Sequence, residues 1–236
     1  SASNSGQVFA AAFLVVELCC FSVMAEERSR KLVASLRRLG LFDTAYWASW
    51  FVVLAGVGLV ACGIAAFAAS VSPGHFFQRT SAMVLFLIFF CYYLASIASA
   101  CFISSLVLNS YISVFIVLGT FTAVLATVAA VGTGFNSFEL DGESCVLSAN
   151  GYNGPYSPGF TAGGFTKFII FWLPWFHGNK ALLDVASFSA QYEDEPFTLG
   201  MLTDSRTMAF RGSTFDAPFV GAACGMLMAN TIVYLA

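Results

Sequence analysis

The stretch EERSRKLVASLRRLGLFDTAYWASWF, residues 26–51, passes from the most charged part of the chain into a long apolar run. Of the 10 Lys and Arg residues in the chain, five lie between positions 25 and 43. The apolar run continues to about residue 71, which exceeds the roughly 20 residues that a helix needs to cross a membrane. Basic residues gathered beside such a run are typical of a short cytoplasmic loop between two membrane spans.

The composition of the rest of the chain agrees with this reading. The chain is 58% hydrophobic and 10% charged, whereas an ordinary soluble domain is about 25% charged. No charged residue occurs between Arg79 and Glu139, an interval long enough for two spans of about 20 residues each. We therefore expect an all-α, polytopic transmembrane helix bundle with about five spans. The expected spans cover residues 8–24, 44–71, 80–106, 112–131 and 215–236.

The segment from residue 135 to residue 214 has a different character and is expected on the exoplasmic side. It opens with a loop rich in Gly, Ser, Asn and Pro. Residues 165–188 are apolar again, but Pro174 and Gly178 interrupt the pattern, and each half is too short to cross a membrane. We interpret this part as a re-entrant or interfacial helical hairpin, because irregular backbone at membrane depth must be buried in protein.

Residues 26–39 predict a short amphipathic helix on the cytoplasmic side. Glu26 stands four residues before Arg30, an order that favours helical ion pairs, and Gly40 follows as a C-cap. Its apolar stripe consists of Leu32, Leu36 and Leu39. Two interpretations remain open at this point. The helix could lie on anionic lipid as an anchor, or it could dock a cytoplasmic partner and transmit motion to the spans.

Three residues within or beside the spans are candidates for an interfacial or gating role. Glu17 is an acid inside the first span, where ionisable residues are costly and often functional. It could line a wet translocation cavity or couple movements; alternatively, it faces another helix, paired with Ser or Thr, or is protonated. Trp47 and Trp50 lie near the inner interface, where they could form an aromatic belt or a gate.

The segments KLVASLRRLGL and YWASWF resemble the corresponding part of subfamily A of the ABC transporters, a lipid-exporting group within the ABC-2 class. The matching positions are Leu32, Arg37, Gly40, Leu41, Trp47, Ser49, Trp50 and Phe51. Leu36 and Leu39 occupy positions where that family usually has Met, a substitution that conserves packing. The resemblance extends over most of the chain in the order of its segments, and over residues 26–51 in specific motif.

This resemblance implies the membrane domain of an ATP-driven transporter that moves lipid, typically phospholipid or sterol. It also implies a first span and a large exoplasmic domain before Ser1, and a nucleotide-binding domain in the same polypeptide or a separate chain. The residues implied in coupling to that domain are Glu27, Arg28, Leu32, Leu36, Arg37, Arg38 and Leu39. A second transmembrane half and membrane lipid would be the further partners.

The sequence does not indicate that this chain catalyses a reaction by itself. It contains no G-x-x-x-x-G-K-[ST] phosphate loop, so ATP and Mg would bind at the nucleotide-binding domain and no cofactor is expected here. No catalytic or metal-binding arrangement, and no basic patch for nucleic acid, is apparent. We expect a multi-pass integral membrane protein, in either the plasma membrane or an internal membrane. Two other functions remain possible: an ABC-2 exporter of polysaccharide or a small hydrophobic compound, and a membrane scaffold or receptor subunit without transport.

Overall fold

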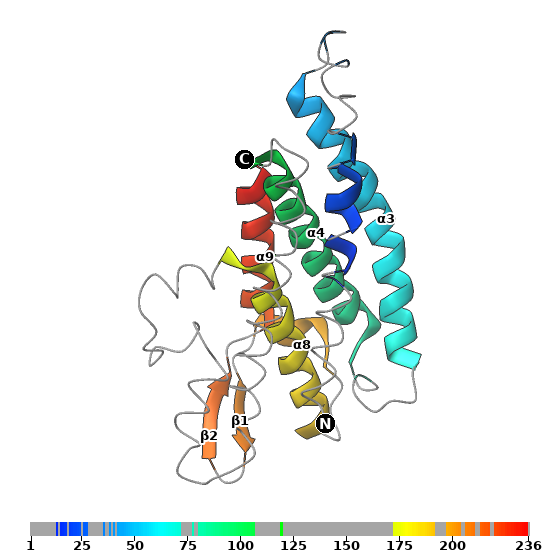
Figure 1. Ribbon diagram of the computed structural model, residues 1–236. Coiled ribbons are helices and arrows are strands. Elements are labelled where there is room, and N and C mark those ends of the chain that lie inside the picture. The colour runs from blue at the N-terminus through cyan, green and yellow to red at the C-terminus, as the bar shows by residue number, and fades with distance from the viewer. Residues whose placement is uncertain are drawn as a thin grey trace, which may run out of the picture.

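The structure, a computed structural model, places several helices side by side with a small β-hairpin at one end (Figure 1). It describes residues 13, 15–17, 19–24, 26–27, 35, 38, 40, 42–71, 77, 80–106, 119, 172–191, 197–203, 206–210, 213–217 and 220–235. The labelled helices are α3 (Asp43–Val71), α4 (Ala82–Leu106), α8 (Pro174–Gln191) and α9 (Val220–Leu235). An apolar helix at Val15–Met24 precedes them and is called the first helix below.

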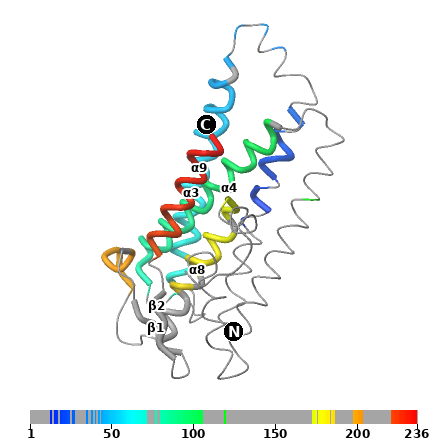
Figure 2. Tube along the Cα trace, turned by 90° about the vertical axis from the view of Figure 1, so that its left-hand side faces the viewer, coloured from blue at the N-terminus to red at the C-terminus, as the bar shows by residue number. Residues whose placement is uncertain are grey.

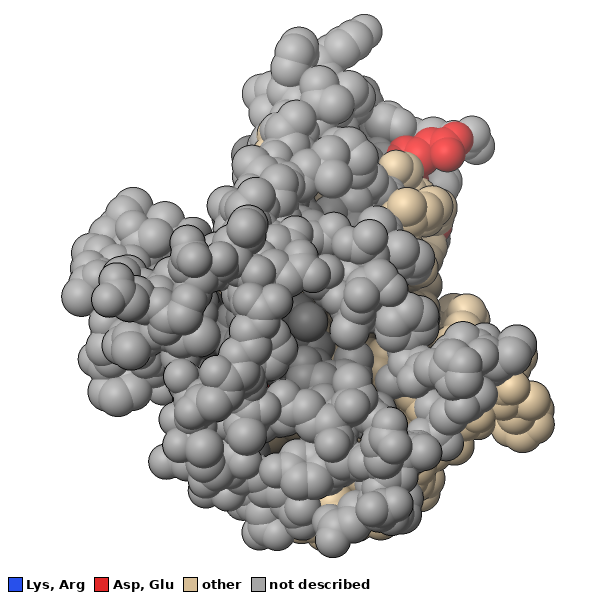
Figure 3. Space-filling model, turned by 90° about the horizontal axis from the view of Figure 1, so that it is seen from below, with Lys and Arg blue, Asp and Glu red and all other residues tan. Residues whose placement is uncertain are grey.

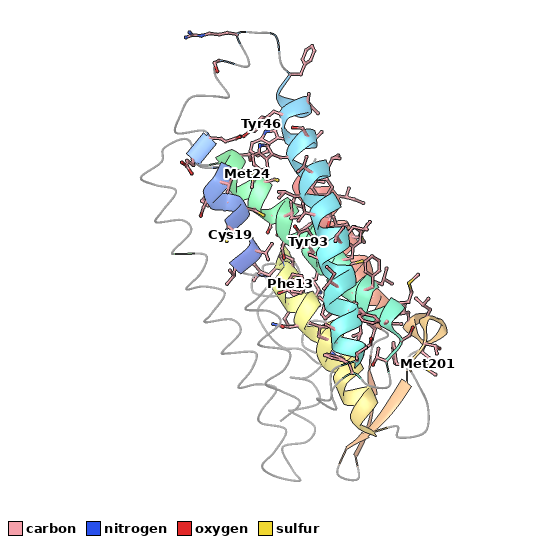
Figure 4. All side chains as sticks on the ribbon, turned by 90° about the vertical axis from the view of Figure 1, so that its right-hand side faces the viewer. Phe13, Cys19, Met24, Tyr46, Tyr93 and Met201 are labelled. Atoms are coloured by element: carbon pink, nitrogen blue, oxygen red, sulfur yellow. The ribbon has the colours of Figure 1, made fainter. Side chains whose placement is uncertain are left out.

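Helix α4 is the centre of the bundle. It packs against α3, α8 and α9, and residues 91–101 are buried on every side of the helix. The first helix also contacts α4: Phe13 lies against Tyr92, with ring centroids 4.5 Å apart, and Met24 Sδ lies 3.9 Å from Cys101 Sγ. These contacts follow the same order along both helices, so the first helix runs parallel to α4 (Figures 2 and 4).

Helix α3 has the opposite environment. It is as apolar as α4, yet most of its side chains are exposed, including Val52, Val60, Ile64 and Phe67. In a membrane such a surface faces lipid or another apolar partner. Because α4 lies at the centre, its Phe89 side chain is fully buried.

The contact between α3 and α4 depends on a glycine. A Cβ atom at Gly58 would lie 1.9 Å from Cε1 of Tyr93, so only glycine permits this approach. Tyr93 is buried, and its hydroxyl donates a hydrogen bond to the carbonyl oxygen of Leu54 at 3.2 Å. The ring therefore contacts α3 at Gly58, and its hydroxyl is bonded to α3 at Leu54, in the close packing that small residues allow between membrane helices.

The number of membrane spans stays a prediction. Among the described residues, two helices are long and apolar enough to cross a membrane, Thr44–Val71 and Ala82–Ser105. They cover nearly the ranges expected for the second and third spans. Val15–Met24 and Val220–Leu235 are apolar but shorter, and the span expected at residues 112–131 falls almost wholly outside the described residues.

Helix α8 corrects one detail of the expected re-entrant hairpin. The helical pattern is interrupted at Leu173 and resumes at Pro174, a residue suited to the first turn because it has no N–H to pair there. The break expected at Gly178 is wrong, since α8 continues through it to Gln191. Gly178 instead makes room for a neighbour: a Cβ atom there would lie 2.5 Å from the Tyr92 ring. Residues 165–171 lie outside the described part, so the hairpin stays a prediction.

Two β-strands modify the all-α expectation. Strands β1 (Arg206–Phe210) and β2 (Ser213–Ala217) form an antiparallel hairpin in which Met208 pairs with Phe215. The expected last span therefore does not begin at residue 215, because Phe215 belongs to β2 and α9 begins at Val220. A 3-10 helix, η3 (Leu199–Thr203), lies before the hairpin. Nearby, the Ser81 N–H donates to the Phe197 carbonyl oxygen at 3.0 Å and ties this region to the start of α4.

The two ends of the bundle differ in which helices begin there and in the presence of the β-hairpin. Helices α4 and α9 begin at the end where the β-hairpin lies, and α3 begins at the opposite end (Figure 1). Gly40, just before α3, has a φ of 90°, as expected for the residue that ends the charged helix. Seen from the β-hairpin end, the described part of the surface is mostly uncharged, with acidic atoms at one edge (Figure 3). The beginning of α3 and the β-hairpin therefore lie at opposite ends of the bundle, and the assignment of these ends to the cytoplasmic and exoplasmic sides stays a prediction.

Candidate functional site

The carboxylate of Glu27 joins the charged segment to the beginning of α3. The Tyr46 hydroxyl donates to Glu27 Oε2 at 2.9 Å, and the Trp50 indole N–H donates to the same oxygen at 3.1 Å. Tyr46 and Trp50 are four residues apart and therefore share one face of α3. Tyr46 is buried in this junction, toward the same end of the bundle as Met24 (Figure 4). Glu27 thus fixes the start of the charged segment to α3 through two hydrogen bonds.

A second polar group lies inside the bundle, between the first helix and α4. Glu17 is only 6% exposed. The Ser99 hydroxyl oxygen lies 2.6 Å from Glu17 Oε1 and 2.8 Å from the carbonyl oxygen of Ser96. One and two turns before Ser99 on the same face are Ser96 and Tyr92, whose buried hydroxyls have no hydrogen-bond partner among the described residues. A row of polar groups therefore follows this face of α4.

Helix α8, which packs against α4, contains a buried ion pair. Lys180 donates to the carboxylate of Asp184, one turn later, and both side chains are almost completely buried. Burial lowers the pKa of Lys180, and the adjacent Asp184 charge opposes that shift. His177 of α8 is also fully buried, with its ring edge-on to that of Phe176 and the two ring centroids 5.6 Å apart.

The structure places five of the predicted site residues and brings one pair of them together. Glu27 accepts a hydrogen bond from the Trp50 indole N–H, and Glu17 is buried inside the bundle. Trp47 is half-buried, with its ring 5.2 Å from that of Tyr46, and Arg38 is exposed. The other predicted coupling residues, Arg28, Leu32, Leu36, Arg37 and Leu39, lie outside the described residues.

Two contact residues, Tyr46 and Ser99, were not identified from the sequence, although a pairing of Glu17 with Ser or Thr was one of the expected alternatives. Tyr46 could have been noticed, because it precedes Trp50 by four residues and so presents its hydroxyl on the same helix face. Ser99 could not be distinguished from the other Ser residues of an uncharged span. The described residues contain no group of three or more His, Cys, Asp or Glu that could hold a metal ion.

Residues 4–236 match the family model described as "ABC-2 family transporter protein". The chain belongs to this family. Its membership makes it a membrane protein of the kind that works with nucleotide-binding domains in ABC transporters. The charged segment and the Glu27 junction are therefore parts of an ABC-2 membrane domain.

Two similar curated proteins belong to subfamily A, which confirms the resemblance carried by residues 26–51. The chain is 24% identical over 217 residues to "ABC transporter A family member 8" of Dictyostelium discoideum, covering 90% of this chain and 24% of that protein. It is 35% identical over 80 residues to "Cholesterol transporter ABCA5" of Mus musculus, covering 34% of this chain and 5% of that protein. The chain spans about a quarter or less of the length of these relatives.

Proposed function

We propose that this chain is the membrane domain of an ATP-driven transporter that moves lipid, and that the Glu27 junction transmits the work of ATP hydrolysis. The observation that carries the coupling part is the pair of hydrogen bonds from Tyr46 and Trp50 to one carboxylate oxygen of Glu27. A displacement of the charged segment would pull directly on the first two turns of α3. A lipid anchor would need no such connection, because surface charge alone would hold it.

Two observations support lipid as the cargo. One relative is named a cholesterol transporter, which favours a sterol or another lipid over a polysaccharide. The long exposed apolar face of α3 also suits a domain whose cargo approaches from the hydrocarbon of the bilayer. Polysaccharide export would instead call for polar side chains and aromatic platforms along an open surface, and the exposed face of α3 is apolar.

The proposal that the cargo is lipid is tested by transport measurements with the full-length protein in liposomes. Fluorescent sterol, phosphatidylcholine and phosphatidylserine are compared with a labelled oligosaccharide, with and without ATP. We expect ATP-dependent movement of at least one lipid and none of the oligosaccharide. ATP hydrolysis without movement of any of these lipids would contradict lipid transport, and an absence of both with a correctly inserted protein would favour the scaffold alternative.

The coupling part is tested at the apolar stripe of the charged helix. Leu36→Asp should leave basal ATP hydrolysis intact and should reduce substrate-stimulated hydrolysis and transport together, because a charge on a docking surface weakens its packing. Ser35→Asp introduces the same charge at an exposed neighbour and is the matched control. Equal transport by both variants would show that the helix only anchors on lipid.

A further inference from the structure

Cys91 of α4 and Cys224 of α9 lie at the same height where these two helices pack together. Further along the helices, the ring centroids of Phe102 on α4 and Tyr234 on α9 are 5.4 Å apart. Phe102 follows Cys91 by 11 residues and Tyr234 follows Cys224 by 10, which is about three helical turns in each case. Because α4 and α9 run in the same direction (Figure 1), the same three turns back from the ring contact lead to both cysteines.

The residues between these two levels put the cysteines on the surfaces that the helices share. On α9 the residues that follow one another in alternating steps of four and three are all buried: Val220, Cys224, Leu227 and Thr231. On α4 the same steps lead from Cys91 to Phe102 and pass through two buried alanines, Ala95 and Ala98. Such steps are typical of parallel helices packed along one seam, and the alanines allow a close approach.

The two thiols also interact with each other through a side-chain hydrogen bond. Both cysteines are free and buried, with Cys91 5% and Cys224 8% exposed. Their surroundings differ on one side. Gly225, directly after Cys224, is exposed, and a Cβ atom there would meet nothing within 4 Å. No side chain therefore shields Cys224 at this point on the outer surface of α9, whereas Cys91 belongs to the central helix.

We propose that Cys91 and Cys224 form an oxidation site, at which a lipid hydroperoxide converts the two thiols into a disulfide between α4 and α9. The oxidant is assigned to this class because it must reach a buried pair through the hydrocarbon of the bilayer, where charged oxidants such as glutathione disulfide are excluded. The proposal goes beyond the proposed function, since the reaction needs neither ATP nor a cargo.

The reaction has two steps. The Cys224 sulfur attacks the terminal peroxide oxygen, the O–O bond breaks, and the thiol proton passes to the departing lipid alkoxide, so that a sulfenic acid and a lipid alcohol form. The Cys91 sulfur then attacks the sulfenic sulfur, and the Cys91 proton leaves with the hydroxyl group as water. Two thiols are oxidised to one disulfide, and the peroxide is reduced to an alcohol and water.

Mass spectrometry of the full-length protein in nanodiscs tests this site, with cumene hydroperoxide as the membrane-soluble oxidant. Remaining thiols are alkylated under denaturing conditions before digestion. We expect a pair of peptides joined through Cys91 and Cys224, which a reductant separates. Cys91→Ala should leave a sulfenic acid on Cys224 that dimedone traps, and Cys224→Ala should leave Cys91 unoxidised. Cys62→Ala removes a buried cysteine of α3 and should leave the link intact.

Two results would overturn the proposal. One is that treated wild type yields Cys91 and Cys224 as fully alkylated as in untreated protein, or joined to other cysteines. The other concerns the oxidant: glutathione disulfide should form no link, and a link formed by it but not by cumene hydroperoxide would mean that the pair reacts from water.

Thermal unfolding provides a second readout that does not depend on transport. A disulfide that closes the long loop between positions 91 and 224 should raise the unfolding temperature by several degrees, and a reductant should reverse the change. Cys224→Ala should show no change on treatment. If the disulfide forms and lowers the unfolding temperature, α4 and α9 do not hold the two sulfurs in position for a bond, and the proposal is overturned.

Discussion

At the scale of single residues, glycines decide how closely the helices approach. Gly58 on α3 and Gly178 on α8 each face the ring of a buried tyrosine on α4, Tyr93 and Tyr92 respectively. Neither ring has room to retreat, because Tyr93 is also bound to α3 through Leu54 and Tyr92 is fully buried. Gly56, two residues before Gly58, differs from both: a Cβ atom there would meet nothing within 4 Å, so this glycine supports no close contact.

Gly56 and Gly58, both in α3, give a matched test of this packing. Gly58→Ala should destabilise the protein by about 1–3 kcal/mol, since an added methyl group overpacks a full interface. Gly56→Ala should be neutral, or stabilising by about 0.5–1 kcal/mol, because alanine favours the helix. Thermal unfolding in detergent compares the two variants. Equal stability would mean that α3 does not rest on Tyr93.

At the scale of elements, α8 is held in the bundle although it contains charged residues. Lys180 and Asp184 are buried together one turn apart, and α8 packs against both α4 and α9. Its beginning is held as well, because the Tyr234 hydroxyl of α9 donates to the carbonyl oxygen of Trp172. The pair keeps its charge compensated inside the helix and makes burial of α8 possible.

Removing one member of the Lys180–Asp184 pair should destabilise the protein strongly, whereas replacing both members should not. Lys180→Met leaves the Asp184 charge buried without its partner and should destabilise the protein by about 3–5 kcal/mol. The double variant Lys180→Met, Asp184→Leu removes both charges and should recover most of that loss. Chemical unfolding of the two variants provides the measurement. A double variant as unstable as the single one would indicate that other contacts of these side chains dominate.

The sequence predicted the helices better than their environments. The positions of α3 and α4 follow from long uncharged runs, but composition did not reveal that α4 is central and α3 peripheral, because lipid and protein interior favour the same side chains. Gly178 was misread as a break, since a glycine that serves a close contact and one that ends a helix look alike in sequence. The β1–β2 hairpin had a signal that was overlooked: two residues, Arg211 and Gly212, separate two short segments of alternating character.

At the scale of the whole molecule, the contacts form a continuous path from one end of the bundle to its centre. Glu27 is bonded to α3 through Tyr46 and Trp50, α3 rests on Tyr93 of α4, and α4 packs against α8 and α9. A force on the charged segment would therefore reach the central helix without passing through the exposed face of α3. Under the proposed function, this path would carry the motion of a nucleotide-binding domain from the charged segment to the central helix.

The most direct test of this account is the number of lipid molecules moved per ATP hydrolysed by Glu27→Ala in the full-length protein, reconstituted in liposomes. Thr44→Ala, at an exposed position in the first turn of α3, is the control. A hydrogen bond to a charged group contributes about 1.5–3 kcal/mol, and about 1.4 kcal/mol corresponds to a tenfold change. We therefore predict that Glu27→Ala retains ATP hydrolysis and moves about tenfold less lipid per ATP, while Thr44→Ala matches the wild type. An unchanged ratio in a correctly inserted Glu27→Ala protein would contradict the account.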